Sequence, residues 1–190
     1  MLRRLLIFAA ILVAMLAGGG ALIRFAGAGA TEFRVTGPEM FIAGPISGAA
    51  ADRIERLLDE HPELEVVVLG DIPGADDTGW LVQMGYLIRG RGLATRAIGD
   101  LNNDAILLFA AGVDREVQGG NLVITGADVA RSRGWPYDDS SAARVERGAY
   151  ARVMLGDAAF VEFAETLRET EDVHIITNHD QLRFGLVTPN

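Results

Sequence analysis

The sequence predicts an α/β protein built around a largely parallel β-sheet. From Thr31 onward, short apolar segments alternate with longer amphipathic ones, and the order strand, helix, strand, helix, strand is typical of parallel sheets. Residues 66–70, VVVLG, are apolar at every position, as in a strand that helices cover on both faces. No internal repeat or low-complexity linker follows Thr31, so we expect one domain over residues 31–190.

The expected elements follow one another along the chain. Residues 32–46 have the pattern of two short strands around a Gly-Pro turn. Residues 49–65 carry Ile54 and Leu58 at helical spacing, and Pro62 ends this helix. The remaining elements are a helix over 80–89, a strand over 93–98, a helix that begins near Ala105, an extended segment over 116–129, one long helix over 141–169, a strand over 173–177, and a short helix leading to a terminal strand over 179–188.

Composition and charge exclude several classes of function. The formal net charge is -9 at pH 7 and the isoelectric point is about 4.8, so the field of the protein repels nucleic acids. The chain has no cysteine, which excludes disulfides, thiol catalysis and thiolate metal sites. We therefore expect no nucleic-acid partner, and nothing in the sequence indicates a cofactor.

The first thirty residues are typical of an export segment. Arg3 and Arg4 precede an uncharged apolar stretch from Leu5 to Ile23, and the small residues AGAGA follow at 26–30. This pattern predicts an apolar helix that is either a cleaved signal peptide or an uncleaved membrane anchor with both arginines in the cytoplasm. Either alternative predicts an exported domain over residues 31–190, periplasmic or tethered to the inner membrane.

A group of polar residues stands directly before the most continuous apolar run of the domain. The group consists of Asp100, Asn102, Asn103 and Asp104. One interpretation is that these side chains cap a buried helix that begins near Ala105. Another is a cation site, because the group contains the pattern D-x-N-x-D. An EF-hand loop is excluded, since Ala105 and Ala111 stand where that loop needs glycine and glutamate.

Three segments of the chain carry a resemblance to a known family. Residues 41–75 are similar to its opening strand, turn, helix and second strand. Residues 86–117 contain RGLATRAIGDLNNDAILLFAAG, which resembles its R-G-L-x-T strand, nucleophile turn and apolar helix, and residues 176–188 end in its G-L-V pattern. The family is the Clp protease/crotonase superfamily, and specifically its exported bacterial periplasmic Clp-type serine peptidases. The resemblance implies a spiral of β-β-α units with a largely parallel sheet.

The resemblance also implies where catalytic groups would stand. Active members place a serine at the start of the apolar helix and a histidine in the following strand. Here the serine position falls on Asn103 and the histidine position on Thr125, and the oxyanion-loop candidates are Gly74 and Ala75. Asparagine has no nucleophilic hydroxyl, and threonine is no proton acceptor near neutrality. The resemblance thus implies a pseudoenzyme that acts in binding or assembly and, like its relatives, forms homo-oligomers.

Two other functions stay open. The first is a working serine hydrolase with relocated catalytic residues. Its candidates are Ser47, Ser140 or Ser141 together with His179 and Asp180. The second is a cation-binding module, for which the resemblance brings a further loop to the same pocket. Its ligands would be Asp71, Asp100, Asn102 and Asp104.

Overall fold

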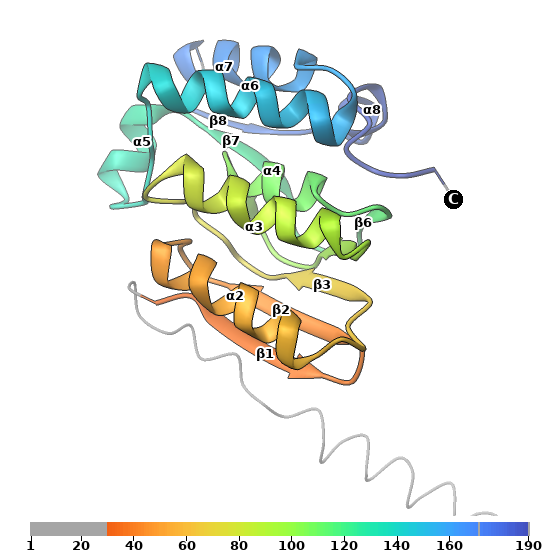
Figure 1. Cartoon of the computed structure of the whole chain (residues 1–190). Coiled ribbons are helices and arrows are strands. Elements are labelled where there is room, and N and C mark those ends of the chain that lie inside the picture. The colour runs from red at the N-terminus through yellow and green to blue at the C-terminus, as the bar shows by residue number, and fades with distance from the viewer. Residues whose placement is uncertain (1–29, 171, 190) are drawn as a thin grey trace, which may run out of the picture.

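The computed structural model describes residues 30–170 and 172–189, which form helices packed around two β-sheets (Figure 1). The export segment expected in the first thirty residues lies almost entirely outside the described residues. Among the helices of residues 30–170 and 172–189, none combines the length and the hydropathy that a membrane span requires.

The larger sheet has five strands in the order β1-β2-β3-β4-β6. They are β1 (Glu32–Thr36), β2 (Glu39–Ala43), β3 (Val66–Leu69), β4 (Ala94–Ala97) and β6 (Arg115–Val117). β1 and β2 form an antiparallel hairpin around Gly37, which has a left-handed φ of 56°, and the other three pairs are parallel. The last three residues of β3 are buried, as its continuous apolar sequence predicts, so the largely parallel sheet is confirmed.

The smaller sheet positions the polar residues that precede the apolar run. Its strands are β5 (Leu101–Asn102), β7 (Leu122–Thr125) and β8 (Val173–Ile175), in that order. β5 is parallel to β7, and β8 is antiparallel to β7. Because β5 and β7 run in the same direction, Asn102 at the end of one strand comes close to Thr125 at the end of the other.

The principal helices lie in a stack. The described helices are α2 (Gly48–Glu60), α3 (Thr78–Gly90), α4 (Ala105–Ala110), α5 (Ala127–Ser132), α6 (Ser141–Leu155), α7 (Ala159–Thr170) and α8 (Asn178–Arg183). α2 contacts α3, α3 contacts α6, and α6 contacts α7, and Figure 1 shows this order from the bottom of the view to the top. The buried helix α4 contacts both α3 and α6.

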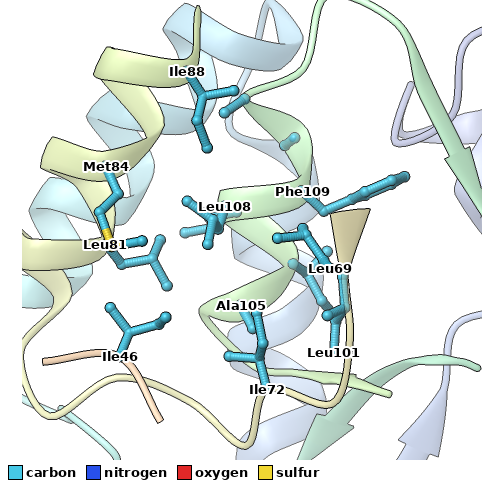
Figure 2. Packing of buried hydrophobic residues seen from close by; sticks show 14 of the residues in the cluster. Ile46, Leu69, Ile72, Leu81, Met84, Ile88, Leu101, Ala105, Leu108 and Phe109 are labelled. Carbon is cyan, nitrogen blue, oxygen red and sulfur yellow. The ribbon is translucent and has the colours of Figure 1, made fainter. Parts of the chain in front are cut away.

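α4 is the centre of the hydrophobic core (Figure 2). Its residues 105–110 are each at most 2% exposed. Figure 2 shows Leu108 on the side of Met84, and Phe109 on the side of Leu69. A six-residue helix is not stable by itself in water, whereas each buried leucine or phenylalanine contributes about 1.5–3 kcal/mol. α4 is therefore maintained by its packing.

The prediction of one long helix over 141–169 is wrong, because the structure has a break between residues 155 and 159. The segment forms α6 and α7, and Gly156 ends α6 with a left-handed φ of 96°. The Asp157 carboxylate then accepts a hydrogen bond of 2.9 Å from the N–H of Ala159 at the start of α7. The apolar stripe is thus divided between two helices that pack on each other.

After β6 the structure differs from the predicted elements at two places. The extended segment expected over 116–129 ends at Thr125, and α5 follows it. The expected terminal strand is wrong, since residues 184–189 contain no strand. Instead the Arg115 guanidinium donates to the carbonyl oxygens of Gly185 and Leu186 at 3.0 and 3.1 Å. These bonds hold the tail without a β-ladder.

Gly85 of α3 provides a test of this packing. A Cβ at residue 85 would lie 1.8 Å from the hydroxyl oxygen of Tyr150, which donates to the Leu107 carbonyl. Although alanine favours helices, we expect Gly85→Ala to lower the free energy of unfolding by about 1–3 kcal/mol in urea denaturation. Gly90→Ala in the same helix is the control, because nothing lies within 4 Å of its added Cβ. A Gly85→Ala protein as stable as this control would contradict the close packing.

Candidate functional site

Asn103 forms a sharp turn between β5 and α4. Its φ is 51°, and it is the only non-glycine residue with a positive φ in the described part of the chain. Asparagine tolerates this left-handed conformation better than most residues. The backbone N–H of Asn103 donates to the Val123 carbonyl at 2.9 Å, so β7 holds the turn in place. A strained turn from strand to buried helix is a feature that sequence periodicity does not reveal.

The side chain of Asn103 contacts the residue that the resemblance compares with a base. The Thr125 N–H donates to Asn103 Oδ1 at 3.0 Å, and the Thr125 hydroxyl donates to Asn102 Oδ1 at 3.1 Å. All three residues are buried. The two amide oxygens are therefore occupied as acceptors. No atom of this group is a hydroxyl nucleophile paired with a proton acceptor of suitable pKa.

One buried polar atom in this turn lacks a partner. Asn103 Nδ2 is inaccessible to solvent and makes no hydrogen bond to the described residues. An unsatisfied buried donor costs about 1–3 kcal/mol, in addition to the left-handed backbone. The turn is thus retained at some cost in stability.

Asp104 follows the turn and forms ion pairs with two arginines. Its Oδ1 lies 2.7 Å from Arg168 Nη2, and its Oδ2 lies 3.2 Å from Arg147 Nη1. The Thr78 hydroxyl at the start of α3 donates to the same Oδ2 at 2.8 Å. The carboxylate is consequently saturated by protein groups that come from three other helices.

Glu165 completes a ring of alternating charges. Its Oε1 lies 3.1 Å from Arg147 Nη2 and 2.7 Å from Arg168 Nη1. We call Asp104, Glu165, Arg147 and Arg168 the Asp104 cluster. Its side chains are 2–14% exposed. Burial disfavours the charge on Arg168, but the adjacent Asp104 and Glu165 outweigh this effect and raise its pKa above the ordinary value.

The aromatic loop after α5 covers the Asp104 cluster. The Arg168 guanidinium lies 5.6 Å from the centre of the Tyr137 ring, and Arg147 Nη1 donates to the Asp138 carbonyl at 2.9 Å. Burial raises the pKa of Tyr137, which keeps its hydroxyl neutral. For Asp138, burial is outweighed by hydrogen bonds from Ser140 and Thr78 and by Arg147, so its pKa is lowered.

The candidate oxyanion loop meets the same aromatic loop. Gly74 has a φ of 145°, and a Cβ on it would lie 2.5 Å from the carbonyl oxygen of Pro136. The Gly74 carbonyl accepts a hydrogen bond from Ile46, and Ala75 is buried and bridges to Ile46. The loop is therefore packed against protein on the side where Pro136 approaches it.

Each of the four residues of the predicted cation site is bonded to other groups of the protein. Asp71 accepts a hydrogen bond from the N–H of Asp100 at 2.8 Å, and Asp100 in turn accepts from Asn121. Asn102 bonds to Thr125, and Asp104 bonds to the arginines described above. Within the described residues, no group of three or more acidic or histidine side chains is placed to hold a metal ion.

The candidates for a relocated hydrolase site have structural contacts instead. The Ser140 hydroxyl caps α6 by accepting from the N–H of Ala143 at 3.1 Å. Asp180 accepts from the Thr177 hydroxyl at 2.6 Å, and His179 is exposed beside it on α8. Among the hydrogen bonds of the described residues, none joins His179 to a serine or to Asp180.

Sequence reasoning did not identify three members of the Asp104 cluster, namely Glu165, Arg147 and Arg168. A signal for the arginines was present. Arg147 stands on the buried stripe of α6 with Ala143 and Tyr150, and Arg168 stands on the buried side of α7 next to Leu167. An arginine in a helical stripe of buried positions indicates a buried ion pair, because an unpaired charge there is too costly.

A hollow elsewhere on the described surface does not belong to this site. Its volume is about 270 Å³, and its lining includes Thr95, Arg96, Arg115 and Thr188. Arg96 pairs with Glu39, and Arg115 is bonded to backbone carbonyls. None of the residues that line the hollow belongs to the Asn103 turn or the Asp104 cluster.

Comparison with known proteins is informative at the level of structure alone. No protein-family model matches the chain, and no curated protein matches its sequence. A peptidase from Plasmodium falciparum aligns with a TM-score of 0.54 at 12% identity, over 79% of this chain and 92% of its own. An enoyl-CoA hydratase from Mycobacterium avium subsp. paratuberculosis K-10 gives 0.52 at 12% identity, over 86% and 69%. One from Shewanella pealeana ATCC 700345 gives 0.50 at 11%, over 85% and 68%.

These likenesses and the two-sheet topology define the fold. The chain has the Clp protease/crotonase fold, as its sequence predicts. Identities of 11–12% establish the fold and not an activity. The chemistry open to this chain is therefore set by the Asn103 turn and the Asp104 cluster.

The Asp104 cluster gives a direct prediction. Arg147→Met would leave Asp104 and Glu165 with one buried arginine between them, and we expect it to lower the free energy of unfolding by about 3–5 kcal/mol. Arg144→Met on the same helix is the control. Arg144 also pairs with Glu165, but its side chain is 56% exposed, so we expect a loss of about 0–1 kcal/mol. Chemical denaturation of both variants checks this, and equal losses would contradict it.

Proposed function

We propose that this chain is a catalytically inactive protein of the Clp protease/crotonase fold that acts in binding or assembly. The single observation that supports the proposal most is the contact between Asn103 and Thr125. Asn103 and Thr125 are the residues that the resemblance aligns with a nucleophile and a base, both are buried, and here they carry an amide and a hydroxyl. The amide is not a nucleophile, and the hydroxyl is no proton acceptor near neutral pH.

The packing around this contact supports the same proposal. Asn103 is buried, and Arg168 Nε, from a guanidinium stacked on Tyr137, lies 3.4 Å from Asn103 Oδ1. Acid–base chemistry by Asp104 or Glu165 would need these carboxylates to be accessible, but both are bound by arginines. A site filled by its own charged side chains favours a structural role over turnover.

Export is the second part of the proposal. The apolar stretch from Leu5 to Ile23 and its preceding arginines, Arg3 and Arg4, support delivery of the domain to the periplasm. If the stretch is uncleaved, it also anchors the domain in the inner membrane. The intact mass of the protein recovered from the periplasmic and membrane fractions distinguishes the two forms.

A fluorophosphonate probe tests the proposed inactivity. The chain has four serines, which are Ser47, Ser132, Ser140 and Ser141. We expect no mass shift after incubation of the purified protein with the probe, because no hydrogen bond of the described residues joins a serine to a histidine, and the Asp138 carboxylate beside Ser140 has a lowered pKa that makes it a poor base. A known serine hydrolase in the same reaction is the positive control.

Stoichiometric labelling of the protein would overturn the proposal and favour a relocated hydrolase. Ser140→Ala and Ser141→Ala would then identify the labelled residue, since these serines stand at the start of α6. Loss of labelling in one variant alone would assign the nucleophile.

A further inference from the structure

In the described part of the chain, β8 forms an open edge of the smaller sheet. Val173 and Ile175 of β8 are 44% and 55% exposed, and β7 is the element on which β8 packs. Residues 172–177, DVHIIT, contain no proline and no lysine, and the register with β7 is regular, without a bulge. Lysine, proline and bulges are among the features that keep an edge strand from pairing with another chain. β8 lacks all three.

The other three edges of the two sheets are protected in different ways. On β1, Glu32 and Arg34 place paired charges along the strand, 2.7 Å apart. The edge of β5 is occupied by the backbone of Ile72, which bonds to it as an isolated bridge. On β6, the backbone N–H and carbonyl of Arg115 bond to Thr188 at 2.9 and 3.1 Å. In this comparison β8 is the edge that is left for a partner.

The backbone of β8 directs hydrogen-bonding groups toward its open side. The Ile176 N–H donates to a β7 carbonyl at 2.8 Å, and the Asp172 carbonyl accepts from the Gly126 N–H at 2.9 Å. In an antiparallel pair, every second residue bonds to the partner strand and the residues between them face away from it. The N–H and carbonyl groups of Val173 and Ile175 therefore point away from β7, where an added strand would meet them.

The side chains of β8 indicate what kind of strand fits. Val173 and Ile175 lie on one face of the sheet, because alternate residues of a strand point the same way. His174 lies on the other face, with its ring 6.0 Å from that of Phe163 in α7. Apolar side chains on an added strand would pack beside the two exposed β-branched residues. The edge thus selects an extended peptide with apolar residues at alternate positions.

Acidic residues at the start of β8 favour a basic partner. Asp172 is exposed, and its carboxylate makes no ion pair with any described residue. Asp128 is close to it, since Gly126 bonds to the Asp172 carbonyl, and Glu169 at the end of α7 is also exposed. A lysine or arginine beside Asp172 would complete an ion pair. A second copy of this chain would instead bring another net charge of -9 to the edge, which repels it.

We propose that the edge of β8 binds an extended, basic peptide segment of another protein as an added antiparallel strand. The antiparallel direction places the carboxyl end of the peptide beside Asp172, so its basic residues lie there. β8 has three residues, which limits the number of main-chain bonds and makes the complex weak and reversible. This interaction goes beyond the proposed function, and it holds whether or not the Asn103 site is inactive.

A synthetic peptide tests the main-chain bonds without any change to the protein. The probe is a fluorescent peptide of alternating valine and threonine with two lysines at its carboxyl end. We expect saturable binding to the full chain, measured by fluorescence anisotropy. Methylation of the valine amide nitrogens removes the donors that face β8 and leaves the side chains, so we expect affinity to fall on the order of tenfold. The same peptide with its lysines at the amino end is expected to bind several-fold more weakly.

A proline variant tests the same bonds from the protein side. Ile175→Pro removes an N–H that faces away from β7, so the bonds between β7 and β8 stay in place. Asn178→Pro is the control, because Asn178 is the first residue of α8, where proline is tolerated. We expect Ile175→Pro to weaken peptide binding on the order of tenfold relative to this control. Circular dichroism of both variants checks that the fold is retained.

Charge reversal tests the predicted basic end of the partner. We expect Asp172→Lys to weaken binding of the lysine peptide several-fold and to strengthen binding of a peptide with glutamates in place of the lysines. Glu55→Lys is the control, since it makes the same change in net charge at an exposed position of α2.

Three results would overturn the proposal. The first is no saturable binding of the lysine peptide, and the second is equal binding of the N-methylated peptide, which decides the matter even where Ile175→Pro fails to fold. The third is a dimer in size-exclusion chromatography that Ile175→Pro abolishes, because this result assigns the edge to a second copy. Equal affinity of Asp172→Lys and Glu55→Lys for the lysine peptide would overturn the basic character of the partner.

Discussion

The buried contact of Asp104 with Arg147 and Arg168 is the interaction on which the rest of the site depends. It connects the start of α4 to α6 and α7, the two long helices between β7 and β8. Isolated charges at this depth would be prohibitively costly, but Glu165 makes the group of four electrically neutral. The desolvation cost of these four charges is offset because each carboxylate pairs with both arginines.

The hydrophobic core and the charged group depend on each other through α4. The helix is too short to persist in water, and its six residues are buried by α3, α6 and the strands. At its start the chain must leave β5 abruptly, and the left-handed Asn103 makes this change of direction. Apolar packing determines where α4 lies, whereas the polar contacts at its start determine which helices close over it.

Periodicity was sufficient for the sheet and for most helices, because apolar runs such as residues 66–70 report burial directly. Periodicity did not predict where a single residue ends a helix, as Gly156 does when it divides the predicted long helix into α6 and α7. The resemblance indicated Asn103 and Thr125, which the structure brings into contact. It gave no indication of Arg147 and Arg168, since a partner for a buried charge lies far away in sequence. Three of the four predicted cation residues lie within residues 100–104, yet they bond to different partners.

The approach of Pro136 to Gly74 bears on what turnover at this site would require under the proposed function. A serine at residue 103 would stand beneath Arg168 and beside a threonine, with the glycine loop already covered by the Pro136 carbonyl. A hydrolase would require a new nucleophile, a new base, removal of a buried arginine and displacement of the aromatic loop. Under the proposed function, no single substitution at this site is therefore expected to produce turnover.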